Sequence, residues 1–82
     1  MAEPIIPGHL LGIADRLAAR IHEAWVERRE SQGWRLGPRR DDEGREHPGL
    51  VPFEQLPESE RDIERGIAVA TLRGLLELGY RI

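Results

Sequence analysis

The sequence predicts a mainly α fold with minor β structure, in which two amphipathic helices pack with a long structured loop and short strands. Apolar residues recur every three or four positions over 9–32 and again over 58–78, which is the spacing of one helix face. The stretch 33–57 between them holds four Pro and four Gly, which interrupt helices. It also carries large apolar side chains, so it predicts a folded loop and not a passive linker.

With 82 residues the chain is long enough for one domain. We assign 9–82 to this domain and 1–8 to an extended N-terminal arm, because Pro4 and Pro7 favour extended backbone. A net charge of −3 disfavours a nucleic-acid partner, and no apolar run reaches the roughly 20 residues that span a membrane. The absence of Cys favours a cytoplasmic location.

The first helix is expected over 9–32, and Gly33 is its expected end, because glycine adopts the left-handed conformation at low cost. Its apolar face should be formed by Leu10, Ala14, Leu17, Ala18, Ile21, Ala24 and Trp25.

The second helix is expected to start near Pro57 and to end at Gly79. The spacing of Ser59 and Asp62 matches a capping box, in which a side chain closes the helix start. The tail 80–82 alternates apolar and polar residues and is interpreted as a short strand that pairs with 34–36 or 50–51. The expected apolar face consists of Ile63, Ile67, Ala70, Leu72, Leu75, Leu76 and Leu78.

His22 and Trp25 lie three residues apart and therefore share a helix face. The favoured interpretation is a core histidine that bonds to loop backbone, and the alternative is a pair that contacts a ligand. The predicted structural core comprises His22, Trp25, Leu50, Val51, Leu72, Leu76 and Tyr80.

The run of charged residues over 39–45 is the most distinctive chemical feature of the sequence. All 12 basic residues of the chain are arginine. Adjacent opposite charges usually form solvated pairs of little energetic consequence. The alternative is a pocket for a nucleotide or another small anion, in which guanidinium groups bind phosphate and aromatic rings stack on a base. The candidate ligand-binding residues are Trp34, Arg39, Arg40, Asp41, Asp42, His47, Phe53, Arg61 and Arg65.

Catalytic and metal sites are not expected. His9, His22 and His47 are too scattered for a zinc motif, and the acidic run over 41–43 lacks the alternating ligands of an EF-hand loop. We therefore expect a protein that is not an enzyme and that carries no metal or cofactor.

Four segments, taken in order, resemble the RyR domain, the repeat named after ryanodine receptors and present in prokaryotic proteins as single copies. The resemblance implies a compact helical module with a few short strands, often paired about a twofold axis, and associated with interaction or ligand sensing without a known reaction. We therefore expect an interaction module that forms a homodimer or docks to a protein partner; the alternative is a sensor for a nucleotide-like small molecule. The four segments are LAARIHEAW, QGWRLGP, HPGLVPFEQLPESERDIER and TLRGLLELGYRI.

Overall fold

The computed structural model describes residues 8–82, so the arm predicted over 1–8 lies almost wholly outside the described residues. Two long helices dominate the described chain, and a small parallel sheet and one 3-10 turn occupy the segment between them. The fold is mainly α with minor β, as predicted. The elements are α1 (Gly8–Ser31), β1 (Arg35–Leu36), β2 (Glu46–His47), η1 (Phe53–Gln55) and α2 (Glu58–Glu77).

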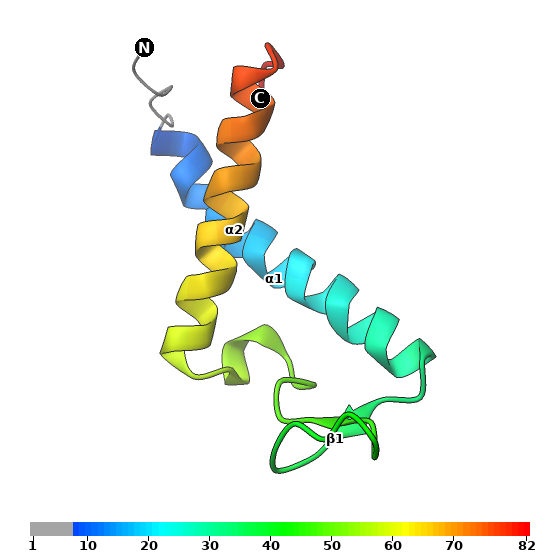
Figure 1. Cartoon of the computed structure of the whole chain (residues 1–82). Coiled ribbons are helices and arrows are strands. Elements are labelled where there is room, and N and C mark those ends of the chain that lie inside the picture. Colours follow the sequence, from blue (N-terminus) through cyan, green and yellow to red (C-terminus); the bar gives the residue numbers. More distant parts are fainter. Residues whose placement is uncertain (1–7) are drawn as a thin grey trace.

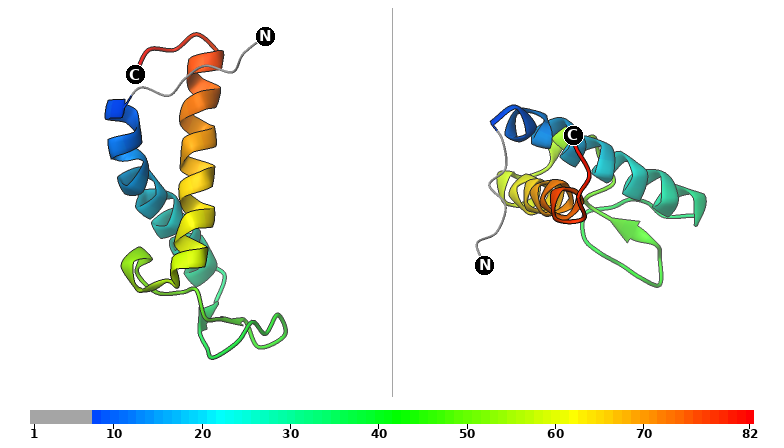
Figure 2. Two further views of the ribbon diagram at one scale, coloured as in Figure 1. Left: turned by 90° about the vertical axis from the view of Figure 1, so that its left-hand side faces the viewer. Right: turned by 90° about the horizontal axis from the view of Figure 1, so that it is seen from above.

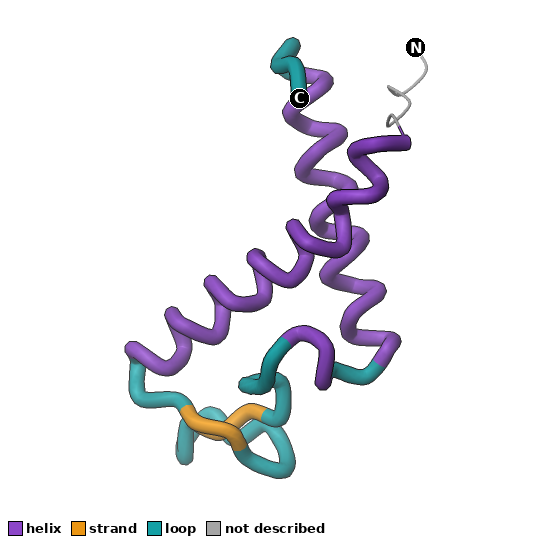
Figure 3. The backbone as a smooth tube through the Cα atoms, turned by 180° about the vertical axis from the view of Figure 1, so that it is seen from behind, coloured by secondary structure: helices purple, strands orange, loops and turns teal. Residues whose placement is uncertain are grey.

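The two helices run in opposite directions and cross (Figure 1). The same crossing is seen from behind in Figure 3, where the last turns of α1 diverge from the start of α2. The connecting segment with β1, β2 and η1 lies across the open end of this wedge. Viewed from the side, the two helices lie next to one another as a single layer (Figure 2).

Two clusters of buried residues hold the helices together. Ala18 and Ala68 are fully buried and pack with two residues from the η1 region, Phe53 and Leu56. Small side chains at the crossing let the two helix backbones approach closely. The second cluster lies nearer the start of α1 and consists of Leu10, Ala14 and Leu72.

Glycine ends α1 as predicted. Gly33 has a φ of 86°, in the left-handed region that favours glycine. Its N–H donates to the carbonyl of Glu30 at 3.0 Å, and the N–H of Trp34 donates to the carbonyl of Arg29 at 3.0 Å. These two bonds form a Schellman motif, which satisfies carbonyls that the helix leaves unpaired.

The same motif ends α2, and it overturns two expectations for the tail. Gly79 has a φ of 91°, and the N–H of Tyr80 donates to the carbonyl of Leu75 at 3.0 Å. This turn closes α2 at the end of the molecule opposite the loop (Figure 1). Residues 80–82 therefore form no strand, and Tyr80 is 64% exposed and not part of the core.

The strand pairing lies wholly within the loop. Arg35 pairs with Glu46 and Leu36 with His47, in parallel register, so the partner of β1 is β2 and not the tail. The side chain of Arg45 ties this unit to the turn that follows α1, because its Nη1 donates to the carbonyl of Gln32 at 2.9 Å.

The start of α2 also differs from expectation. Pro57 is the N-cap residue, and no side-chain hydrogen bond caps the helix. Ser59 lies inside the first turn, so it does not form the predicted capping box. Glu58 and Glu60 place negative charge in that turn, where it is favoured by the helix dipole.

The other predicted core residues occupy the interior to different degrees. Leu50 and Leu72 are buried with His22, whereas Trp25, Val51 and Leu76 are half-buried. Several apolar positions of the second helical segment face solvent, among them Ile63, Ile67 and Leu78.

Candidate functional site

A cleft of about 420 Å³ lies where α1, the loop and the first half of α2 meet. The lining residues are His22 and Trp25 from α1, His47, Pro48 and Gly49 from the loop, Leu56 and Pro57 from the connection between η1 and α2, and Glu60 and Glu64 from α2.

Aromatic rings from α1 and the loop form one corner of the cleft. Because His22 and Trp25 are three residues apart on α1, their rings stack, with centroids 5.5 Å apart and an interplanar angle of 28°. The ring of His47 meets the ring of Trp25 edge-on, at 5.0 Å and 76°. The edge-on arrangement is a favoured geometry for aromatic pairs.

His22 is the buried polar residue at this corner and is 2% exposed. Its Nε2 lies 2.8 Å from the carbonyl oxygen of Val51. A carbonyl oxygen only accepts, so Nε2 carries the proton of this bond. The bond ties the loop to α1, in agreement with the interpretation of His22 as a core histidine that bonds to loop backbone.

The other ring nitrogen of His22 faces α2. Its Nδ1 is buried without a hydrogen-bond partner and lies 3.5 Å from Oε1 of Glu64. The Glu64 side chain is partly exposed and lines the cleft. The cleft therefore borders a buried nitrogen and a carboxylate that are close to one another but not hydrogen-bonded.

His47 has one fixed role at its Nδ1, which accepts the backbone N–H of Gly49 at 2.8 Å. Burial, and then the positive charges of Arg40 and Arg29, lower the pKa of His47 below its usual value. A neutral ring that accepts at Nδ1 carries its proton at Nε2. His47 thus offers an N–H donor at Nε2.

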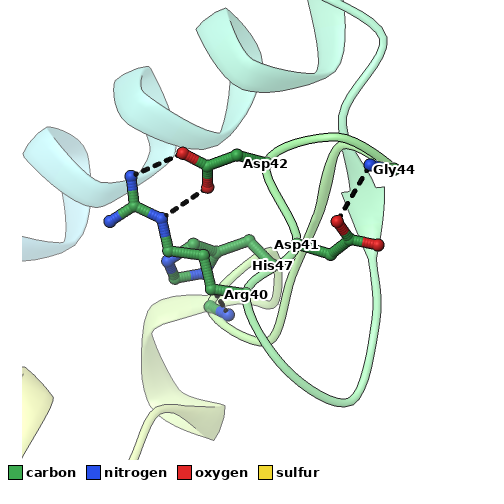
Figure 4. A network of polar contacts seen from close by, with 6 residues as sticks. Arg40, Asp41, Asp42, Gly44 and His47 are labelled. Atoms are coloured by element: carbon green, nitrogen blue, oxygen red, sulfur yellow. Dashed lines mark hydrogen bonds and ion pairs between the residues drawn. The ribbon is translucent and has the colours of Figure 1, made fainter.

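Part of the charged run of the loop is paired within the loop itself (Figure 4). Arg40 binds both oxygens of Asp42, at 2.8 and 3.4 Å, and this hydrogen bond is the main reason that the pKa of Asp42 is lowered. Asp41 accepts the backbone N–H of Gly44 at 3.0 Å and so shapes the turn. The expected solvated pair is present in Arg40 and Asp42, both of which are exposed.

The family model of the RyR domain matches residues 1–82, the whole chain. The chain belongs to the RyR domain family. In this RyR domain the cleft joins two of the four segments that carry the resemblance, since His22 and Trp25 belong to LAARIHEAW and the remaining lining residues to HPGLVPFEQLPESERDIER.

The structure does not gather the predicted ligand residues of this RyR domain into one anion pocket. Arg65 lies between two carboxylates, with its Nε 2.6 Å from Asp15 and its Nη1 2.8 Å from Asp62. Phe53 is 7% exposed and belongs to the buried core cluster with Ala18, although it also lines a second cleft.

The remaining candidates are spread over the surface. Trp34 is half-buried at the end of α1, where the guanidinium of Arg29 lies 5.0 Å from its ring centroid. Arg39 is exposed and Arg61 is half-buried on α2. Of the predicted ligand residues only His47 lines the cleft just described.

Sequence reasoning missed the acidic side of the cleft. Glu60 and Glu64 lie one turn apart on α2, and in the sequence they resemble any solvent-facing acidic pair. The available signal was the spacing of His22 and Trp25, which placed two polar aromatic rings on one helix face. The loop residues that complete the cleft lie more than 20 positions after His22 and Trp25 in the sequence. No local pattern indicates that they are close to these two residues in space.

A second cleft of about 430 Å³ lies on another side of α1 and is lined by acidic and apolar residues. Neither cleft of the RyR domain has an arginine in its lining. Within residues 8–82, no group of three or more potential ligands is arranged to hold a metal ion. No helix of the described chain has the length and apolar character needed to cross a membrane.

Proposed function

We propose that this RyR domain is a noncatalytic interaction module that pairs with a second copy of itself through the exposed side of α2. The observation that carries the proposal is an apolar stripe that the monomer leaves uncovered. Ile63 is 59% exposed and Leu78 is 75% exposed, at opposite ends of α2. Contiguous exposed apolar patches of this kind mark interaction surfaces. The stripe consists of Ile63, Ile67, Leu75 and Leu78.

The two glycines of α2 bear on how closely a second helix can approach. A Cβ added at Gly66 or Gly74 would meet no atom within 4 Å, so neither glycine is required by packing inside the monomer. Each glycine costs a helix about 1 kcal/mol relative to alanine. With 3.6 residues per turn, Gly74 projects within the stripe, where a missing side chain lets a second helix approach, whereas Gly66 projects about 60° outside the edge of the stripe at Ile63.

The shape of the molecule also favours pairing. The described chain measures 46 × 22 × 20 Å and has a radius of gyration of 15.2 Å, whereas a compact domain of this length has about 12 Å. An elongated single layer of two helices buries little of its own apolar surface. In a dimer with a twofold axis, the stripe of each copy would lie against the stripe of the other copy.

Ile67→Asp is expected to convert a dimer into a monomer. The variant places two carboxylates against an apolar surface, one from each copy, while in the monomer the side chain is 47% exposed and the fold tolerates the change. Sedimentation equilibrium at high micromolar concentration measures the mass. Ala24→Asp is the control, because it puts the same charge on an exposed alanine of α1.

Gly74 provides a second arm of the same experiment. If the stripe is covered by a second copy, Gly74→Ala weakens the dimer, although alanine favours the isolated helix by about 1 kcal/mol. A wild-type monomer whose melting temperature rises with this alanine contradicts pairing. In that case the stripe would belong to a different protein partner.

A sensor for a nucleotide or another phosphate-bearing ligand is the second candidate. Its support is Arg39, which is exposed beside Arg40 and makes no ion pair with the described residues. A nucleotide at 100 times its dissociation constant should stabilise the fold by about 2.7 kcal/mol, measured as a thermal shift. The shift should be lost in Arg39→Gln. No shift with any nucleotide removes this candidate.

A further inference from the structure

We propose that the second copy lies antiparallel on α2, with the twofold axis between Ala70 and Thr71, so that Ile67 of each copy packs over Gly74 of the other. This inference rests on the proposed pairing through the stripe and adds the orientation and the register of the partner helix. Three features of α2 carry it: the order of large and small residues on its exposed side, the distribution of its charges, and the position of the loop.

The exposed side of α2 has a seam of residues that recur every three or four positions. Along the helix, the seam has two large side chains, then an alanine and a glycine, then a third large side chain. Ile67 is 47% exposed, and a Cβ added at Gly74 would meet no atom within 4 Å. The seam therefore has a ridge at Ile67 and a hollow at Gly74. Its members are Ile63, Ile67, Ala70, Gly74 and Leu78.

Only the antiparallel orientation places each ridge over a hollow. In a parallel twofold pair every residue faces its own equivalent, so Ile67 meets Ile67 and Gly74 meets Gly74. The helices would be held apart at the first point and leave a gap at the second, and packed interiors contain few such gaps. In the antiparallel pair, Ile67 faces Gly74 and Ile63 faces Leu78. The contact of Ile67 with Gly74 then occurs twice, about 10 Å apart along the helix.

The charges of α2 also disfavour the parallel orientation. Residues 58–65 hold four carboxylates and two guanidinium groups, whereas residues 66–78 hold one of each. Parallel pairing would bring two negative helix starts together, and like charges that face one another oppose association. Antiparallel pairing places each negative start beside the balanced end of the other helix. It also sets the two helix dipoles in opposite directions.

The loop lies at the start of α2 and leaves the other end of the helix open (Figure 1). In a parallel pair both loops would lie at the same end of the dimer, beside the diverging ends of both α1 helices. In an antiparallel pair the two loops lie at opposite ends. Each loop then has space of its own.

Disulfide cross-linking tests the orientation, because the chain has no cysteine and each introduced cysteine reports on one contact. A disulfide requires Cα atoms within about 7 Å of one another. Ala70→Cys lies beside the axis and should cross-link to itself in a glutathione redox buffer. Ile63→Cys alone and Leu78→Cys alone should not, because each lies about 22 Å along the helix from its own equivalent. A mixture of these two variants should give about tenfold more cross-linked dimer than either alone.

Ala24→Cys is the control for random collision, since Ala24 is exposed on α1, and it should give no cross-linked dimer. Circular dichroism checks the fold of each variant. A spin label on Glu60→Cys keeps the test decisive if Ile63→Cys no longer pairs, because Glu60 lies outside the seam. Two such labels are about 30 Å apart along the helix in the antiparallel pair and side by side in a parallel pair.

The outcomes separate the orientation from the pairing itself. A dimer in which Ile63→Cys cross-links to itself, or in which the Glu60 labels lie side by side, is parallel. The orientation is then wrong, although pairing through the stripe stands. A wild-type dimer without cross-links at Ala70 and in the mixture pairs through another surface, which overturns the register. A wild-type monomer in sedimentation equilibrium removes the pairing and this inference together.

Discussion

Phe53→Ala is expected to lower the free energy of unfolding by about 3–5 kcal/mol, the cost of removing a buried phenylalanine. Phe53 is 7% exposed and packs with Ala18 and Ala68, the residues at which the two helices cross. The loss comes from apolar contacts and from the cavity that the smaller side chain leaves. A domain of this size has a total stability of about 5 kcal/mol, so the variant should be largely unfolded in mild denaturant.

Urea denaturation followed by circular dichroism measures this change. Tyr80→Ala is the matched control, because it removes an aromatic ring that is 64% exposed, and it should alter stability by less than about 0.5 kcal/mol. A stable Phe53→Ala protein would contradict the assignment of this ring to the core. It would return Phe53 to the candidate ligand-binding residues.

Leu10→Ala is expected to cost about 2–5 kcal/mol, although Leu10 lies in the first turn of α1. Its side chain is 1% exposed and packs with Ala14 and Leu72 in the second core cluster. Ends of helices often fray, but this one is held by α2. The loss of Leu10 should therefore destabilise the whole domain and not only the first turn.

Leu11→Ala provides a close control for this experiment. The neighbouring residue is 52% exposed, and the same substitution changes helix propensity by the same amount. Thermal melts of the two variants should differ by more than 10 °C, since 1 kcal/mol shifts the midpoint of a small domain by about 4–8 °C. Equal midpoints would show that the second cluster contributes little to stability.

The helices could be predicted from the sequence because their signals are local. The apolar spacing over 9–32 marked α1, and Gly33 and Gly79 marked the two ends through a conformation that glycine adopts readily. The strand predicted for the tail 80–82 was wrong for a related reason. Alternation over three residues is a weak strand signal, and the turn at Gly79 holds Tyr80 against the end of α2 instead.

The pairing of β1 with β2 and the cleft could not be predicted in the same way. A strand of two residues has too few positions for a periodic pattern. The cleft depends on the angle at which the helices diverge, which is set by packing at Ala18 and Ala68. His22 was expected to bond to loop backbone, but its proximity to Glu64 follows only from that crossing.

Leu17 packs against both core clusters, one that contains the helix crossing and one that lies nearer the start of α1. Opening of either cluster therefore removes neighbours from the other through a shared side chain. Such shared contacts make unfolding cooperative, so the two ends of the molecule behave as one thermodynamic unit despite its elongated shape. A disturbance at the loop then reaches the far end of α2 as a change in the stability of the whole domain.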